Sequence, residues 1–449
     1  MTKRPRLRLA LLAGLACACG EPERRPSVIL ISIDTLRADH VGTYGYERDT
    51  TPFLDRFARD AVVYEQAFTP APWTLVAHMT MLTGLFPAQH GVVQEELALS
   101  PEVPLLAERL KAAGYQTLGL YYPCWIHARY GFARGFDVFR AHGSVEEARG
   151  LALAELARLD RARPYFLFLH LFDVHDGPIA TGAHMLYASP PPYQDFFMPE
   201  AAEKLPALAP DVLWESQGLL TPEQVAALVA LYDGGIRHVD ANLALLFGEL
   251  ERGGWLANTL VIVTADHGEA LAQRGKLSGH GDLAQEGLHV PLIVRHPRAE
   301  RAGTRVAEPV HLGDVVPTIL ALSALPADER LAGQSLFAPL SEERLITGTF
   351  LPEEYVVRWP EKLLRHQGLG CLGVDLERDP GELDFRPADP KLFKRLQAEA
   401  LGPRVYPAAL QLAPLSSAER DELRALGYGG DDDDDEDGEE DGGDKREDG

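Results

Sequence analysis

An aspartate and a histidine on adjacent residues, Asp266 and His267, are the first candidates for chemistry in this chain. Adjacent side chains diverge on a regular helix or strand, but a turn with a glycine such as Gly268 lets both face one cation. A carboxylate oxygen together with an imidazole nitrogen is typical of Zn²⁺ or Mn²⁺, whereas Ca²⁺ prefers oxygen ligands alone. His280, on the following loop, is a further candidate.

Asp34 supplies a second carboxylate at the end of another apolar run. A single aspartate in this setting is more often a helix cap or a turn residue. Asp34 and the pair Asp266–His267 nevertheless stand in matched settings, each directly after an apolar run. We therefore predict that these three residues hold a divalent metal ion.

The elements that must position these residues are continuous apolar runs. Runs without alternation indicate strands that are buried on both faces, as in a parallel sheet. Helical patterns at 100–114, 221–254 and 313–325 separate them, which is typical of βαβ units. The sequence thus predicts an α/β fold with a large, mostly parallel sheet between helices; its runs are 27–34, 114–122, 165–175, 259–268 and 289–295.

Polar residues end three of these runs. Asp34 ends the first, Asp173 and His175 end the third, and Asp266–His267 end the fourth. In open α/β sheets, ligands bind beyond the carboxyl ends of the strands. We therefore expect these residues to meet at one edge of the sheet.

The two ends of the chain predict further segments. Residues 1–19 combine basic residues with an eleven-residue apolar run, too short to span a bilayer. They resemble a lipoprotein signal with Cys17 or Cys19 as the lipidated residue, and simple secretion is the alternative. After a linker at 20–26, we predict a catalytic domain at 27–330 and an α+β subdomain with an antiparallel sheet at 331–428. The acidic tail, 429–449, is predicted to be disordered.

Charge and the predicted signal limit which partners and which location are expected for the protein. The net charge is -24, of which -11 lies in residues 431–449, and the remaining -13 argues against nucleic acid as a partner. The signal predicts an exported protein, periplasmic or at the cell surface, held to the membrane by a lipid anchor.

Several ordered motifs resemble the sulfatase family of the alkaline phosphatase superfamily. The resemblance covers about residues 27–428 and rests on ISIDTLRADHVGTYGY, WTLVAHMTMLTGLFPAQHGV, FLHLFDVHDGP, NTLVIVTADHGEAL and GVDLERDPGEL. It implies a large α/β domain with a smaller C-terminal subdomain built on a four-stranded antiparallel sheet. It also implies that Asp34, Asp266 and His267 are the metal ligands.

Thr74 matches the family's nucleophile, which is cysteine or less often serine, nine residues before Thr83. The start of a helix would favour an anion there, and a metal ion would lower the pKa of the hydroxyl and take Thr74 as a ligand. The alternative role is a helix cap. Threonine cannot become the formylglycine that sulfatases use.

Other positions depart from the sulfatase pattern. His78 stands where the family motif has an arginine, and Ile33 replaces a second metal carboxylate. The remaining set resembles the active site of phosphoethanolamine transferases, which has one acidic ligand, a threonine and an Asp-His pair. Those enzymes pass through a phospho-threonine intermediate.

Four more residues are candidates for the reaction. His175 matches a position that lines the family's anion pocket. Arg37 either orients the nucleophile or forms a salt bridge with Asp39. Lys276 and His280 are candidates to contact or protonate the leaving group.

The sequence therefore predicts a hydrolase with one divalent ion (Zn, Mn or Ca) that cleaves a sulfate or phosphate ester of a small molecule, glycan or lipid headgroup. Two alternatives stay open: a phospho-group transferase and a non-catalytic lipoprotein that binds glycan or protein.

Overall fold

The computed structural model describes residues 24–175, 187–205, 220–274, 281–331, 333–341, 343–403 and 407–412. The predicted signal, Lys276, His280 and the acidic tail lie outside these ranges. Within them, no helix is both long enough and apolar enough to cross a membrane.

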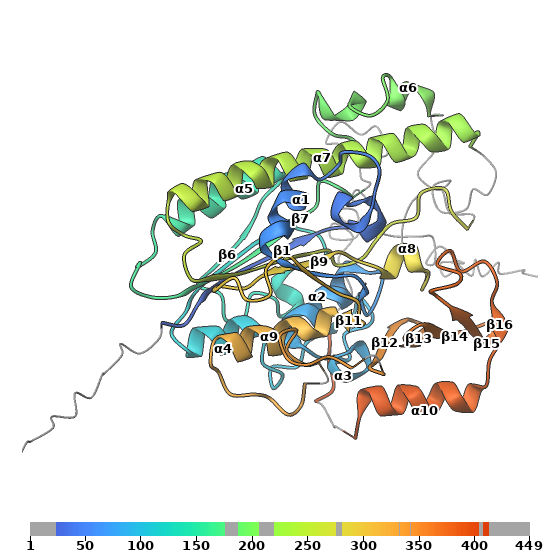
Figure 1. Ribbon diagram of the computed structural model, residues 1–449. Helices are drawn as coiled ribbons and strands as arrows, with labels where there is room; N and C mark the ends of the chain where they lie inside the picture. The colour runs from blue at the N-terminus through green and yellow to red at the C-terminus, as the bar shows by residue number, and fades with distance from the viewer. Residues whose placement is uncertain are drawn as a thin grey trace, which may run out of the picture.

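An eight-stranded sheet forms the centre of the larger part of the molecule (Figure 1). All five predicted apolar runs contribute a strand, and three short strands join them. In order across the sheet, the strands are β10 (Thr304–Val306), β2 (Val62–Tyr64), β9 (Leu292–Arg295), β8 (Thr259–Thr264), β1 (Ser27–Ile33), β7 (Tyr165–Leu171), β5 (Gln116–Tyr121) and β6 (Val138–Ala141). The residues of β1 from Val28 to Ile33 are at most 1% exposed, as expected for a strand covered on both faces.

Strand β9 departs from the parallel arrangement that its apolar run predicted. It pairs antiparallel with both β8 and β2, whereas the other neighbours in this sheet pair in parallel. The connection from β8 to β9 contains only the short helix α8 (Gln285–Leu288) among its described residues. An antiparallel neighbour needs a returning loop and no crossover helix, so this connection suits the reversed direction.

Helices cover both faces of the sheet (Figure 1). On one face, α7 (Pro222–Arg252) packs against α5 (Val145–Leu156) and α1 (Pro52–Phe57). On the other face, α2 (Thr74–Thr83) packs against α4 (Leu106–Ala112) and α9 (Val315–Leu322). The structure thus confirms the mostly parallel sheet between helices, and α2 carries the predicted nucleophile.

The C-terminal part is a smaller antiparallel sheet with one helix across it (Figure 1). It has five strands where the resemblance implied four, because the two-residue strand β16 pairs with the edge of β15. Helix α10 (Pro390–Leu401) buries Phe393 and Leu396 against this sheet. The strands are β12 (Leu345–Phe350), β13 (Glu353–Arg358), β14 (Glu361–His366), β15 (Gly370–Asp375) and β16 (Arg386–Pro387).

This smaller sheet contacts the segment that leads into α2. The Tyr355 hydroxyl donates to the carbonyl of Thr69 at 2.5 Å, and the Thr349 amide donates to the carbonyl of Pro70 at 2.9 Å. A Cβ atom at Gly348 would lie 2.0 Å from that Pro70 oxygen, so only glycine permits the approach. The sheet therefore fixes the backbone four residues before Thr74.

A buried ion pair joins the smaller sheet to the loop that follows Asp266 and His267. Lys362 Nζ lies 2.6 Å from Glu382 Oε1, and both side chains are fully buried. Lys362 also donates to the carbonyl of Leu283, and Glu382 accepts from the Gln285 amide at 2.7 Å.

The substitution Glu382→Gln is expected to lower the free energy of unfolding by about 3 kcal/mol, since it leaves the buried Lys362 ammonium without its counter-charge. Urea denaturation of the full chain measures the change. Glu399→Gln, an exposed position on α10, is the control and should leave stability unchanged. Equal stability of the two variants would contradict a stabilising role for the pair.

Candidate active site

Three neighbouring strands bring the predicted residues together. Strands β8, β1 and β7 lie side by side, and Ser32 of β1 is in register with Thr264 of β8 and His170 of β7. Their carboxyl ends therefore meet at one edge. Asp34 and the pair Asp266–His267 follow these ends directly and are fully buried. The edge predicted from the sequence is thus the one at which these residues gather.

Helix α2 begins at this edge with Thr74 as its first residue. The residue in the N-cap position is Trp73, which makes no side-chain cap hydrogen bond, so the helix-cap interpretation of Thr74 does not hold. The Thr74 hydroxyl lies 3.3 Å from His267 Nε2 and is fully buried. A hydroxyl here stands at the positive end of the helix dipole, where an anion is favoured.

The hydrogen bonds of the two carboxylates direct one oxygen of each toward the same point. Asp266 Oδ1 accepts from the amides of Thr35 and His267, at 3.3 and 2.9 Å. Asp34 Oδ2 lies 3.1 Å from His170 Nε2. In the described part of the chain the other oxygens, Asp34 Oδ1 and Asp266 Oδ2, are buried without a hydrogen-bond partner. Buried carboxylate oxygens of this kind call for a cation.

His267 presents its ring to the same point. Its Nδ1 lies 3.0 Å from the carbonyl of Gly268, an acceptor only, so Nδ1 carries the proton. Nε2 then has a lone pair, and it lies 3.8 Å from Asp34 Oδ1 and 3.5 Å from Asp266 Oδ2. Ligand atoms of these three residues lie within 4.8 Å of one another. Two carboxylates and one imidazole fit a single divalent ion, with Thr74 beside them.

His78 is placed beneath this group, one turn along α2 from Thr74. Its Nδ1 donates to the Thr74 carbonyl at 2.9 Å, and its Nε2 lies 3.0 Å from Ser32 Oγ. Burial, opposed by the nearby Asp266 carboxylate, lowers the pKa of His78 to about 4, so the ring is neutral at pH 7. It therefore lacks the positive charge of the arginine that the family motif has there.

His170 is a further residue at this edge that was not among the candidates from the sequence. It lies on β7, and its Nε2 donates to Asp34 Oδ2, which fixes the orientation of that carboxylate. Burial lowers the pKa of His170 to about 3. Together with His78 and Asp266 it forms a second group whose ligand atoms lie within 4.8 Å of one another. A polar side chain inside the otherwise apolar run YFLFLHL was the signal that could have identified it.

The remaining candidates lie in different surroundings. Arg37 forms a salt bridge with Asp39 at 2.7 Å and donates to the Glu269 carbonyl, which is the second of the two roles left open for it. The His175 ring stacks on Phe172 with centroids 4.4 Å apart and is 7% exposed. Lys276 and His280 lie outside the described residues, so their roles stay predictions.

Comparisons with known proteins agree with this fold. The family model described as Sulfatase matches residues 26–324. The ulvan-active sulfatase of Formosa agariphila is 24% identical over 339 residues, which cover 70% of this chain but only 64% of that protein's length. The steryl-sulfatase of Mus musculus is 27% identical over 560 residues, covering 94% of this chain and 89% of that protein.

Among solved structures, the chain is similar in fold to the phosphonate monoester hydrolase of Agrobacterium radiobacter. The TM-score is 0.68 at 20% identity, covering 84% of this chain and 96% of the other. Since the family model spans more than half of the sequence, the chain belongs to the sulfatase family of ester hydrolases.

Proposed function

We propose that this protein hydrolyses a sulfate or phosphate ester, with Thr74 as the nucleophile at a site for one divalent metal ion. The observation that carries the proposal is the position of the Thr74 hydroxyl, 3.3 Å from His267 Nε2. The same nitrogen lies 3.8 Å from Asp34 Oδ1 and 3.5 Å from Asp266 Oδ2, two buried oxygens that have no hydrogen-bond partner in the described part of the chain. Asp34, Asp266 and His267 would hold the ion.

A bound divalent ion supplies positive charge that lowers the pKa of a nearby hydroxyl and stabilises the ester anion. In the first step, the Thr74 oxygen forms a bond to sulfur or phosphorus. The bond from that atom to the ester oxygen breaks, and the proton of Thr74 leaves with the departing alcohol. In the second step, water attacks the threonine ester, which releases sulfate or phosphate and restores the hydroxyl.

Threonine favours phosphorus over sulfur as the atom attacked. A formylglycine hydrate can expel sulfate by returning to the aldehyde, but threonine has no such route and its ester must wait for water. His78 also leaves the site without the cationic side chain of the family motif. Among the proteins of similar fold, two are named for the hydrolysis of a phosphonate monoester. We therefore place phosphate and phosphonate esters ahead of sulfate esters.

We also propose that the reaction takes place outside the cytoplasm, at a membrane. The signal-like segment at 1–19 supports an exported protein that is anchored in the membrane by lipid and meets small-molecule, glycan or headgroup esters outside the cytoplasm. Export and anchoring can be checked by fractionation of cells and by labelling with a fatty-acid analogue, with Cys17→Ser and Cys19→Ser as paired variants.

The test of the function compares four p-nitrophenyl esters on the full chain after addition of Zn²⁺ or Mn²⁺: sulfate, phosphate monoester, phosphodiester and phosphonate monoester. We expect metal in a ratio of about one per chain and turnover of a phosphorus ester. Turnover of the sulfate alone would overturn the preference for phosphorus. Phosphoryl transfer to an added alcohol in place of water would favour the transferase. The absence of both metal binding and turnover would favour a binding protein.

A further inference from the structure

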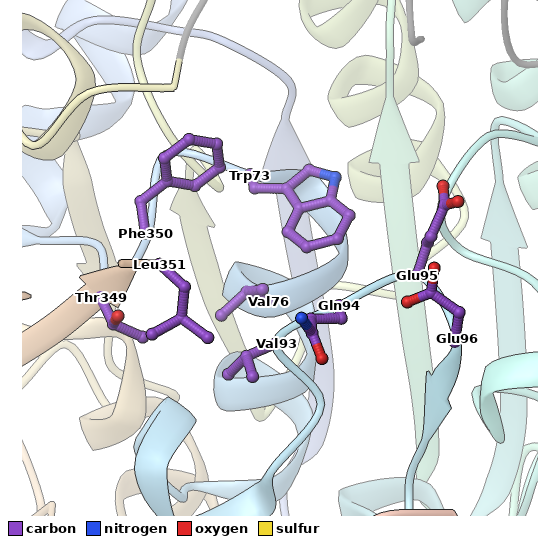
Figure 2. Close-up of a pocket in the computed structure, with 9 residues that line it drawn as sticks. All are labelled: Trp73, Val76, Val93, Gln94, Glu95, Glu96, Thr349, Phe350 and Leu351. Atoms are coloured by element: carbon purple, nitrogen blue, oxygen red, sulfur yellow. The ribbon is translucent and has the colours of Figure 1, made fainter. Parts of the chain in front are cut away.

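A cavity of about 310 Å³ opens beside the first turn of α2 (Figure 2). Trp73 and Val76 contribute one part of its wall from this helix. Consecutive Cα atoms are about 3.8 Å apart, so the wall at Trp73 begins one residue from the proposed nucleophile Thr74. The cavity therefore adjoins the backbone of the residue proposed to attack the ester.

Aromatic and aliphatic side chains form one side of the cavity. Figure 2 shows Phe350 and Leu351, from the smaller sheet and the turn after it, on one side, with Trp73 between them and the opposite side. The rings of Trp73 and Phe350 meet edge to face with centroids 6.5 Å apart. Trp73 also packs edge to face on the buried Trp125, at 5.1 Å. These contacts hold the indole ring in place at the cavity.

Carboxylates form the opposite side. Glu95 and Glu96 stand there together, across from Phe350 and Leu351 (Figure 2). None of the nine residues that line the cavity is basic. Glu96 forms no ion pair within the described part of the chain. The half-buried Glu96 carboxylate beside aromatic rings attracts a cation by ion pairing, and the ring faces add to this attraction.

We propose that this cavity binds the alcohol part of the substrate and that this alcohol is small and carries a positively charged amine. The proposal rests on the hydrolase function given above. The volume lies at the lower end of the range for small-molecule sites, about 300–1,000 Å³, which favours a small alcohol over an extended glycan chain. Glu96 and Trp73 would then determine specificity, while Thr74 carries out the reaction.

Binding of the alcohol alone tests the cavity without any need for turnover. Choline and 3,3-dimethylbutan-1-ol have the same shape and differ by one positive charge, and calorimetry on the full chain measures both affinities. We expect choline to bind about tenfold more tightly. Glu96→Gln should remove most of this difference, and Glu399→Gln, which changes the net charge equally on the exposed face of α10, should not. Equal affinity for both alcohols, or an undiminished preference in Glu96→Gln, would overturn the proposal.

Turnover of matched esters separates this proposal from the proposed function. Phosphate esters of the same two alcohols are compared by kcat/KM, with p-nitrophenyl phosphate, whose leaving group carries no ammonium, as the reference. A preference for the choline ester that Glu96→Gln lowers supports the cavity. Hydrolysis of the reference ester with no preference between the two alcohols overturns the cavity and leaves the hydrolase standing. Charge-selective binding of choline with no ester hydrolysed supports the cavity and overturns the hydrolase.

Discussion

Thr74→Ala is expected to lower kcat/KM by about four to six orders of magnitude, the range typical for loss of a covalent nucleophile. The alanine removes the hydroxyl that lies 3.3 Å from His267 Nε2 and leaves the proposed metal ligands Asp34, Asp266 and His267 in place. The backbone of α2 should be unaffected, because Trp73 and not Thr74 occupies the N-cap position. Steady-state assays on the reference p-nitrophenyl ester measure the loss.

Thr74→Ser is the matched control for this loss. Serine keeps the hydroxyl and should retain turnover within about tenfold of the original chain, since only the methyl group that packs in the buried site is removed. The metal affinities of the two variants should agree to within about tenfold, because Thr74 adds at most one ligand to three. Mass analysis of acid-quenched enzyme should find the transferred group on Thr74. Equal activity of Thr74→Ala and Thr74→Ser would exclude threonine as the nucleophile.

Periodicity and the ends of the apolar runs predicted much of this architecture. The five runs could be read as strands because burial on both faces of a sheet requires continuous apolarity, which is plain in 27–33 and 259–264. The short strands β2, β6 and β10 have three or four residues each, which is too few for a period to show. The reversed direction of β9 was also not readable, because a strand has the same composition in either direction.

The proposed metal ligands were predicted more completely than the residues around them. Asp34, Asp266 and His267 come directly after strands, so chain order and sheet topology were enough to bring them together. His170 points into the site from within a strand, and which face of β7 meets Asp34 depends on the register with β1. Sequence alone does not give that register.

The cavity beside α2 is the feature that could least be predicted from the sequence. Its two sides come from the segment around Glu95 and from the end of β12 near Phe350, more than 250 residues apart in the chain. Neither segment has a motif, and their approach depends on the contacts of Tyr355 and Thr349 with the backbone before α2. Under the two proposals made above, substrate specificity depends on the docking of the smaller sheet, whereas the reacting residues are positioned by the larger one.

Asp266→Asn is expected to weaken the binding of Zn²⁺ or Mn²⁺ by at least about 100-fold and to abolish turnover, with the fold retained. The asparagine oxygen can still accept from the amides of Thr35 and His267, as Asp266 Oδ1 does. Its amide nitrogen then replaces Oδ2, the buried oxygen without a hydrogen-bond partner, and an amide nitrogen does not ligate a cation.

Calorimetric titration with metal gives the affinity of each variant, and thermal melting gives its stability. Two further variants are measured in the same way. His170→Asn removes the ring that orients Asp34 and should weaken metal binding by a smaller factor, about 10- to 100-fold. Asp384→Asn, exposed on the smaller subdomain, should leave both metal affinity and melting unchanged. Because a ligand that binds only the folded state raises its stability, added metal should raise the melting temperature of the original chain and not that of Asp266→Asn. Unchanged metal affinity in Asp266→Asn would place the ion elsewhere, because both groups of candidate ligands in the described part of the chain contain Asp266.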